Sequence, residues 1–249
     1  PKPMLTRWQE IAEIPQFWFV TITPYGRDIE PYVRHKQEIL QSFRELSKRV
    51  GSHRIGWRYD PILINDKYTV EYHLRAFETM AKTLQGSTHQ CVISFIDLYK
   101  KTIKNFPQVT EVSKADQFFL AERLVEIGKR FDIEIYTCLE DPAFARFGVN
   151  TTGCMSRLVL ERAIRKSLKP EQSNARQGCA CLLGNDIGAY NTCLHGCLYC
   201  YANYDRKLVE QNAKQHDPDS PLLVGHVHKE DTIIEVQPKS MADVQVRLF

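Results

Sequence analysis

The segment Phe17-Trp18-Phe19-Val20-Thr21-Ile22-Thr23-Pro24-Tyr25-Gly26 contains the pattern from which the fold is predicted. Its first seven residues are all aromatic or β-branched, which is typical of a strand, and the Pro-Tyr-Gly that follows is a turn signal. Apolar residues then recur at helical spacing between Ile39 and Val50, and Gly51 follows in the position of a C-terminal cap. A strand followed by an amphipathic helix is the repeating unit of a parallel α/β sheet.

Three further strand–helix units follow the first. The pattern predicts strands at residues 55–59, 91–96 and 133–137, and helices at residues 74–84, 120–131 and 160–168. Four successive units predict an α/β fold with a parallel sheet and right-handed crossovers, either a partial or complete TIM-like (β/α) barrel or an open doubly wound sheet. Four units do not close a barrel. Because the helical pattern at residues 5–14 has no strand before it, we expect an upstream strand–helix region to be missing.

Polar side chains stand where the predicted strands end. Ligands of parallel α/β proteins collect at the carboxyl ends of the strands, so these side chains are expected to face one mouth. The candidates for substrate positioning or proton transfer are Arg58, Asp60, Asp97 and Glu140. A structural alternative exists for the acids that precede prolines, because Asp60 before Pro61 and Asp141 before Pro142 are also typical of turns.

The composition indicates a globular chain with a clustered set of cysteines. Apolar residues make up 43% and charged residues 25%, the formal charge is +3, and no apolar run has transmembrane length, so neither a nucleic acid nor a membrane is an expected partner. Five of the eight cysteines lie between residues 179 and 200. Such clustering without a signal peptide favours metal binding over disulfides and predicts a cytoplasmic protein. We expect an α/β domain at residues 1–170 and a cysteine-rich region at 171–249 packed on it.

The spacing of Cys193, Cys197 and Cys200 predicts an iron–sulfur site. Three thiolates bind three irons of a [4Fe–4S] cluster and leave the fourth iron open. A closed zinc site with four thiolates is the alternative. Cys179 and Cys181 are further candidate metal ligands, which could close the cluster, hold a second metal or form a redox pair. The sequence leaves these three alternatives open.

Longer motifs carry a resemblance to a known family. The run from Cys179 to Asn203 resembles a bacterial family catalogued as domain of unknown function 1848. Further matching pieces are Gly26-Arg27-Asp28-Ile29-Glu30-Pro31, Trp57-Arg58-Tyr59-Asp60-Pro61-Ile62, Ser94-Phe95-Ile96-Asp97 and Ser220-Pro221-Leu222-Leu223. The C-terminal cysteines look like the cluster loop of radical S-adenosylmethionine enzymes. This resemblance implies a [4Fe–4S] cluster on Cys193, Cys197 and Cys200, S-adenosylmethionine as cofactor, an electron donor, and a small-molecule or macromolecular substrate.

Two departures from radical S-adenosylmethionine enzymes are visible. The cysteine loop follows the predicted sheet, whereas those enzymes place it after the first barrel strand. No Gly-Gly-Glu segment is evident, and Glu140 is a candidate substitute. The competing hypothesis is an α/β hydrolase-like enzyme or a binding protein whose cysteines form a closed structural zinc or iron–sulfur site.

Overall fold

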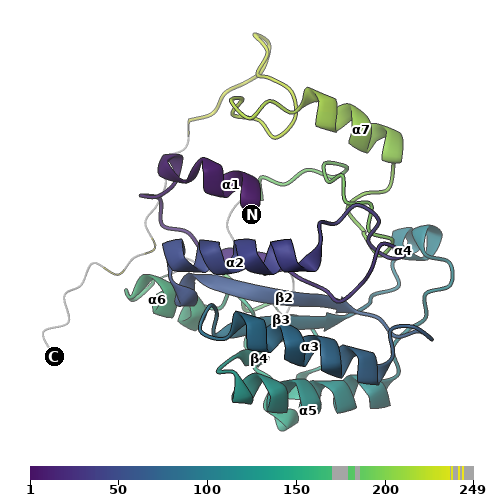
Figure 1. Cartoon of the computed structure of the whole chain (residues 1–249). Coiled ribbons are helices and arrows are strands. Elements are labelled where there is room, and N and C mark those ends of the chain that lie inside the picture. Colours follow the sequence, from purple (N-terminus) through teal and green to yellow (C-terminus); the bar gives the residue numbers. More distant parts are fainter. Residues whose placement is uncertain (170–178, 183–185, 236, 238–240, 242, 244–249) are drawn as a thin grey trace, which may run out of the picture.

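Four parallel strands form the sheet in the computed structural model of the chain (Figure 1). They are β1 (Trp18–Thr21), β2 (Ile55–Ile62), β3 (Gln90–Phe95) and β4 (Glu134–Tyr136), arranged in the order β1-β2-β3-β4. Each strand pairs in parallel with the next one in the sequence. The structure describes residues 1–169, 179–182, 186–235, 237, 241 and 243. The predicted parallel α/β sheet is therefore confirmed, but a closed barrel is not.

The helices between the strands lie side by side on one face of the sheet (Figure 1). They are α2 (Lys36–Val50), α3 (Val70–Leu84) and α5 (Lys114–Arg130). Side-chain caps fix two of their starts, because Thr69 accepts a hydrogen bond from the amide of Tyr72 and Ser113 accepts one from the amide of Asp116. The shorter elements are α1 (Lys2–Thr6), η1 (Trp8–Glu10), η2 (Ser52–Arg54), α4 (Lys100–Asn105), η3 (Pro142–Phe147), α6 (Arg157–Ile164) and α7 (Arg206–Gln215).

The main core lies between the sheet and these helices. The strand register places four buried side chains in one row across the sheet, facing the helices: Val20, Trp57, Cys91 and Ile135. The ring of Trp57 is fully buried and stacks on Phe77 of α3, with 4.7 Å between the ring centroids. Because successive residues of a strand point to opposite faces, the next residue of each strand lies on the other face.

This other face is apolar at the middle of the strands and polar at their carboxyl ends. Val92 and Tyr136 form a small second core with Val159 of α6. Further along the same face come Asp60, Ser94 and then Cys138, two residues beyond Tyr136. The sheet therefore presents a carboxylate, a hydroxyl and a thiol at its carboxyl-terminal edge.

Beyond β4 the chain returns to the sheet edge at a fifth position. Asn150 forms a parallel bridge with Tyr136, its amide donates to the carbonyl of Ile135 (2.8 Å), and its carbonyl accepts from the amide of Thr137 (3.0 Å). The parallel order of the sheet thus continues for one residue past β4. Among the described residues no further strand extends the sheet.

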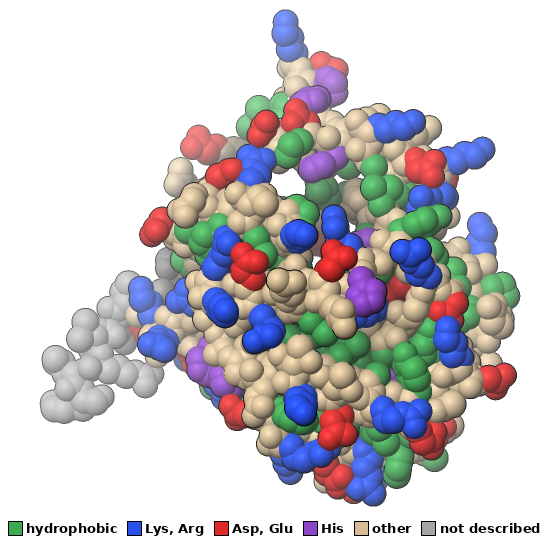
Figure 2. All heavy atoms as spheres, viewed as in Figure 1, with side chains coloured by type: hydrophobic (Ala, Val, Ile, Leu, Met, Phe, Trp, Pro, Cys, Tyr) green, Lys and Arg blue, Asp and Glu red, His purple; other side chains and the backbone are tan. Residues whose placement is uncertain are grey.

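The structure confirms the predicted strands and main helices. The pattern at residues 5–14 corresponds to the short elements α1 and η1, while the last predicted helix ends at Ile164 rather than at residue 168. The polar stretch at residues 171–178 and the boundary at 170 lie outside the described residues. No helix in the described ranges is long and apolar enough to span a bilayer. On the face drawn in Figure 2, basic and acidic side chains are interspersed, as the small net charge suggests.

Candidate functional site

The loop that carries Cys193, Cys197 and Cys200 packs against the chain just after β1. The amide of Leu198 donates to the carbonyl of Ile29 (3.0 Å), and the amide of Tyr32 donates to the carbonyl of His195 (3.1 Å). The hydroxyl of Tyr199 donates to the carboxylate of Glu30. The cysteine loop therefore lies at the carboxyl end of β1, although it follows that strand by more than half of the chain.

The carboxylate of Glu30 is the buried anchor of this contact, with only 3% of the residue exposed. It pairs with the ammonium of Lys36 at the start of α2 and accepts a hydrogen bond from the hydroxyl of Thr23. Burial, followed by the negative charge of Glu30, raises the pKa of Tyr199, so its phenol stays protonated and donates. One carboxylate thus joins β1, α2 and the cysteine loop.

Two asparagines shape the base of the loop. Asn191 is 1% exposed, and its side-chain oxygen accepts hydrogen bonds from the amides of Tyr204 (2.9 Å) and Asp205 (3.2 Å). The side-chain amide of Asn203 donates to the carbonyl of Cys193 (2.6 Å). These contacts tie the two ends of the loop together immediately before α7. Both asparagines belong to the run from Cys179 to Asn203 that carries the family resemblance, but their spacing predicts no role for either.

The three loop thiols lie in different surroundings. Cys193 is exposed, whereas Cys197 and Cys200 are half-buried. A hydrogen bond with His195 lowers the pKa of Cys193 and raises that of the imidazole. Burial, reinforced by the charge of Glu30, raises the pKa of Cys197 to about 12. The loop therefore carries three free thiols, whose sulfurs do not all lie within 4.8 Å of one another.

Gly196 allows this loop to approach the segment after β1. Its φ of +66° lies in the left-handed region, and a Cβ atom there would meet the ring of Tyr32 at 3.1 Å. The guanidinium of Arg206 covers the same ring at 4.9 Å from its centroid. The positive φ of the turn thus favours glycine at this position, and the close packing against Tyr32 adds to that preference.

Of the four candidates at the strand ends, Arg58 and Asp60 are joined by hydrogen bonds, whereas Asp97 and Glu140 bond to other residues. Asp60 accepts a hydrogen bond from Arg58 (3.0 Å from Nε) and another from the hydroxyl of Ser94 on β3. Asp97 is exposed and accepts from the hydroxyl of Tyr99 (3.1 Å). Glu140 accepts from the amide of Phe95 (3.1 Å). Asp60 therefore links β2 and β3 at the mouth.

Asp141 has a structural role, as its position before Pro142 predicted. Its carboxylate caps η3 by accepting a hydrogen bond from the amide of Ala143 (2.9 Å), and it lies 3.4 Å from the ammonium of Lys114. Tyr25, which follows β1, is also structural, because its buried hydroxyl donates to the carbonyl of Pro61 (2.8 Å) and accepts from the amide of Leu63 (2.9 Å).

The pKa of Glu140 is unusually high for a carboxyl group. Burial, together with the negative charges of Asp97 and Asp60, raises its pKa to about 7, against the opposing hydrogen bond from the amide of Phe95. A group with this pKa exchanges its proton near neutral pH, which suits general acid–base chemistry. Of the four strand-end candidates, Glu140 is thus the one whose environment favours proton transfer.

The acidity of Glu140 predicts a pH-dependent stability. Its folded-state pKa of about 7 lies above the usual 4.5, so the folded protein retains a proton that the unfolded chain releases. The contribution of Glu140 to the free energy of unfolding should therefore be greatest below pH 4.5 and fall by up to about 3 kcal/mol as the pH rises from 4.5 through 7. Urea unfolding across this range measures the effect. Glu140→Gln keeps an acceptor for Phe95 and should lack this slope; identical slopes in the two proteins would contradict the assignment.

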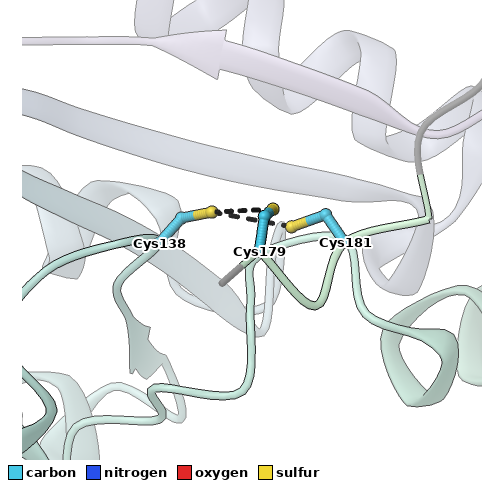
Figure 3. A group of neighbouring side chains, drawn as sticks. All are labelled: Cys138, Cys179 and Cys181. Carbon is cyan, nitrogen blue, oxygen red and sulfur yellow. Dashed lines mark hydrogen bonds between the residues drawn. The ribbon is translucent and has the colours of Figure 1, made fainter. Parts of the chain in front are cut away.

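A separate group of cysteines lies at the other edge of the sheet. The sulfurs of Cys138, Cys179 and Cys181 lie within 4.8 Å of one another and could together hold a metal ion (Figure 3). Cys138 follows β4, and the other two belong to the later cysteine-rich segment. Hydrogen bonds with the thiols of Cys138 and Cys154 lower the pKa of Cys181. The structure thus brings the predicted metal ligands Cys179 and Cys181 to the end of β4.

Cys154 also lies next to Cys181 of this group, although the sequence did not predict it as a metal ligand. Its sulfur lies 3.8 Å from that of Cys181. No other cysteine stands near Cys154 in the sequence, so spacing gave no signal. Cys154 follows shortly after Asn150, the residue that pairs with the edge of β4. This place after a strand-like position could have marked Cys154 as a candidate, but it is recognised only in the folded structure.

Comparison with known proteins gives one match. A family model described as Domain of unknown function (DUF1848) matches residues 1–202, a range that includes the sheet and both groups of cysteines. No curated protein and no solved structure matches the chain.

Proposed function

The chain belongs to the DUF1848 family, and from its geometry we propose that it is an iron–sulfur enzyme of the radical S-adenosylmethionine type. The observation that carries this proposal is the contact of the cysteine loop with the carboxyl end of β1 through Ile29, Glu30 and Tyr32. Active sites of parallel barrels lie at this end of the strands. A loop that comes late in the sequence therefore reaches the place that radical S-adenosylmethionine enzymes give to their cluster.

The loop has the donor set that such a cluster needs. Cys193, Cys197 and Cys200 offer three thiolates, and three thiolates leave one iron of a [4Fe–4S] cluster open. When bound, the cluster and S-adenosylmethionine supply a one-electron cleavage that generates a radical able to abstract hydrogen from a substrate. The half-buried position of Cys197 and Cys200 suits this chemistry because it limits the access of water.

The chain's own side chains have supporting roles in the proposal. The buried carboxylate of Glu30, paired with the half-buried Lys36 and bonded to Tyr199, holds the loop in place at the end of β1. Asp60 orients the guanidinium of Arg58, which is suited to bind a carboxylate or phosphate group of the substrate. Glu140 holds a proton that it can give up near neutral pH, and Asp97 adds a second acid at the mouth.

The direct test is cleavage of S-adenosylmethionine by anaerobically reconstituted protein. With dithionite as electron donor, the wild type should form 5′-deoxyadenosine, and the triple variant Cys193→Ala, Cys197→Ala, Cys200→Ala should form none and lose the iron of the cluster. Cys91→Ala is the matched control, because Cys91 is fully buried in the helix-covered core. Iron-loaded wild type that leaves S-adenosylmethionine intact would rule out this proposal.

A second candidate function is a hydrolase-like enzyme or binding protein with a closed structural metal site. The close packing of the sulfurs of Cys138, Cys179 and Cys181 favours it, because zinc sites with thiolate ligands are compact. In this case the acids of the mouth would act on a substrate without any cluster. Protein purified without oxygen would then contain zinc but neither iron nor sulfide.

A further inference from the structure

We propose that Cys138, Cys154, Cys179 and Cys181 form a closed tetrathiolate site for one zinc ion, separate from the cysteine loop. This inference goes beyond the proposed function, since it assigns a different metal to a different set of residues. It adds Cys154 as the fourth ligand. It also resolves the open alternatives for Cys179 and Cys181 in favour of a second metal.

The spacing of the sulfurs fits a single ion better than a cubane. In a tetrahedron with zinc–sulfur bonds of about 2.3 Å, neighbouring sulfurs lie about 3.8 Å apart. The sulfur of Cys138 lies 3.8 Å from that of Cys179 and 3.6 Å from that of Cys181, and Cys154 lies 3.8 Å from Cys181 (Figure 3 for the first three cysteines). Thiolates of a [4Fe–4S] cluster bind separate irons at the corners of a cube, which holds their sulfurs much farther apart.

The backbone around the site brings the ligands together. Ser156 and Cys181 form an antiparallel bridge, and the amide of Leu182 donates to the carbonyl of Met155 (2.9 Å). The amide of Met155 also donates to the sulfur of Cys181 (3.3 Å). Such a hydrogen bond stabilises a thiolate and orients it toward a metal. The segments that carry Cys154 and Cys181 are thus already joined without the ion.

Two further contacts fix Cys154 beside the sheet. Its carbonyl accepts a hydrogen bond from the side chain of Gln90 at the start of β3 (2.7 Å). Gly153, with a φ of +96°, lies directly against the sulfur of Cys181, where a Cβ atom would approach to 3.2 Å. A glycine here lets the chain turn and leaves room for the thiolate. Both contacts favour a built site over a chance encounter of thiols.

The site is closed and lies apart from the cysteine loop. Cys179 and Cys181 are buried, and although the sulfur of Cys154 does not lie within 4.8 Å of all three others, a shell of four thiolates would leave no position for water or substrate. Cys138 follows β4, whereas the loop packs at the end of β1, on the opposite edge of the sheet. Three strand spacings separate these edges, about 14 Å along the sheet. One metal therefore cannot use both sets of cysteines.

Zinc binding at this site would be accompanied by the release of protons from the thiols. Zinc enters as a divalent cation, the four thiols lose up to four protons, and no electron is transferred. The resulting structural ion would join the end of β4, the turn before α6 and the segment of Cys179 at one point. Its role would be structural, to hold this edge of the sheet, beyond which the described residues form no further strand.

Metal analysis of anaerobically purified full-length variants tests the proposal. The wild type should contain one zinc per chain, and the triple variant Cys193→Ala, Cys197→Ala, Cys200→Ala should keep that zinc while it loses iron. Cys154→Ser should lose most of the zinc, and Cys91→Ala should retain it, since Cys91 faces the helix-covered core. Zinc that disappears with the loop cysteines, or persists fully in Cys154→Ser, would overturn the proposal.

X-ray absorption at the zinc edge of the wild type provides a readout that does not depend on the folding of a variant. We expect four sulfur neighbours at about 2.3 Å and no nitrogen, oxygen or iron neighbour. Cobalt substitution should give the intense visible bands of tetrahedral thiolate coordination. A mixed sulfur–nitrogen shell, a disulfide between any two of the four cysteines, or wild type without zinc would each contradict the site. Because the loop variant separates iron from zinc, failure of this proposal and failure of the proposed enzyme are distinguishable.

Discussion

Glu30→Ala is expected to destabilise the protein by about 3 kcal/mol, because it removes the buried carboxylate that the half-buried ammonium of Lys36 and the hydroxyls of Thr23 and Tyr199 share. The same change removes the acceptor of Tyr199, which is the side-chain contact between the cysteine loop and the exit of β1. We therefore expect both a lower free energy of unfolding and weaker retention of iron. Urea unfolding and iron content after reconstitution measure the two effects.

Three variants separate the parts of this effect. Tyr199→Phe removes only the hydrogen bond from the loop and should lower stability by about 1.5–3 kcal/mol. The double variant Glu30→Ala, Lys36→Met removes both charges and should be more stable than Glu30→Ala alone. Glu30→Gln keeps an acceptor for Tyr199 and Thr23 and should retain more iron than Glu30→Ala. A Glu30→Ala protein as stable as the wild type would show that the carboxylate of Glu30 is not an anchor.

Removal of zinc from the proposed tetrathiolate site is the second change with a large expected effect. A ligand that binds only the folded state at 1,000 times its dissociation constant stabilises that state by about 4 kcal/mol, so a strong chelator should lower stability by at least this amount. Hydrogen exchange should accelerate at the amides of Met155 and Leu182, which bond near the site. Amides of α3 and α5, which cover the face of the sheet opposite to Cys138, should keep more of their protection.

The triple variant of the loop cysteines is the background for this experiment, because any loss of stability in it cannot come from iron. Zinc added back after chelation should restore both stability and exchange protection. Cys154→Ser on the same background should resemble the chelated protein and respond little to zinc. Equal protection of Met155 and Leu182 with and without chelator would contradict a structural role of the ion.

The fold was largely predictable because its signals are local. The strand that includes Trp57 and the helix that includes Phe77 are each fixed by the periodicity of a few neighbouring residues, and the parallel order follows from their alternation. The bridge at Asn150 was not predictable, since one paired residue leaves no periodic pattern. A single hydrogen-bonded position depends on where β4 ends, which is information about the tertiary structure.

The candidate site likewise has a part that local sequence predicts and a part that only the folded structure reveals. The spacing of Cys193, Cys197 and Cys200 lies within one loop and could be recognised at once, whereas Cys138 and Cys154 join Cys179 and Cys181 only through the folded sheet. The perturbed pKa of Glu140 depends on burial and on acids distant in the sequence. Asp141 illustrates the opposite case, in which the local rule for an acid before proline was correct.

The contact between Tyr199 and Glu30 spans 169 positions of the chain, whereas each strand pairs with its nearest successor. Closing a long loop costs more conformational entropy than closing a short one, so contacts of low sequence separation form first during folding. During synthesis on the ribosome, β1 to β4 can therefore assemble before the cysteine loop has emerged. The loop then reaches a preformed surface, so its thiols remain accessible to solvent until the contact with Glu30 forms.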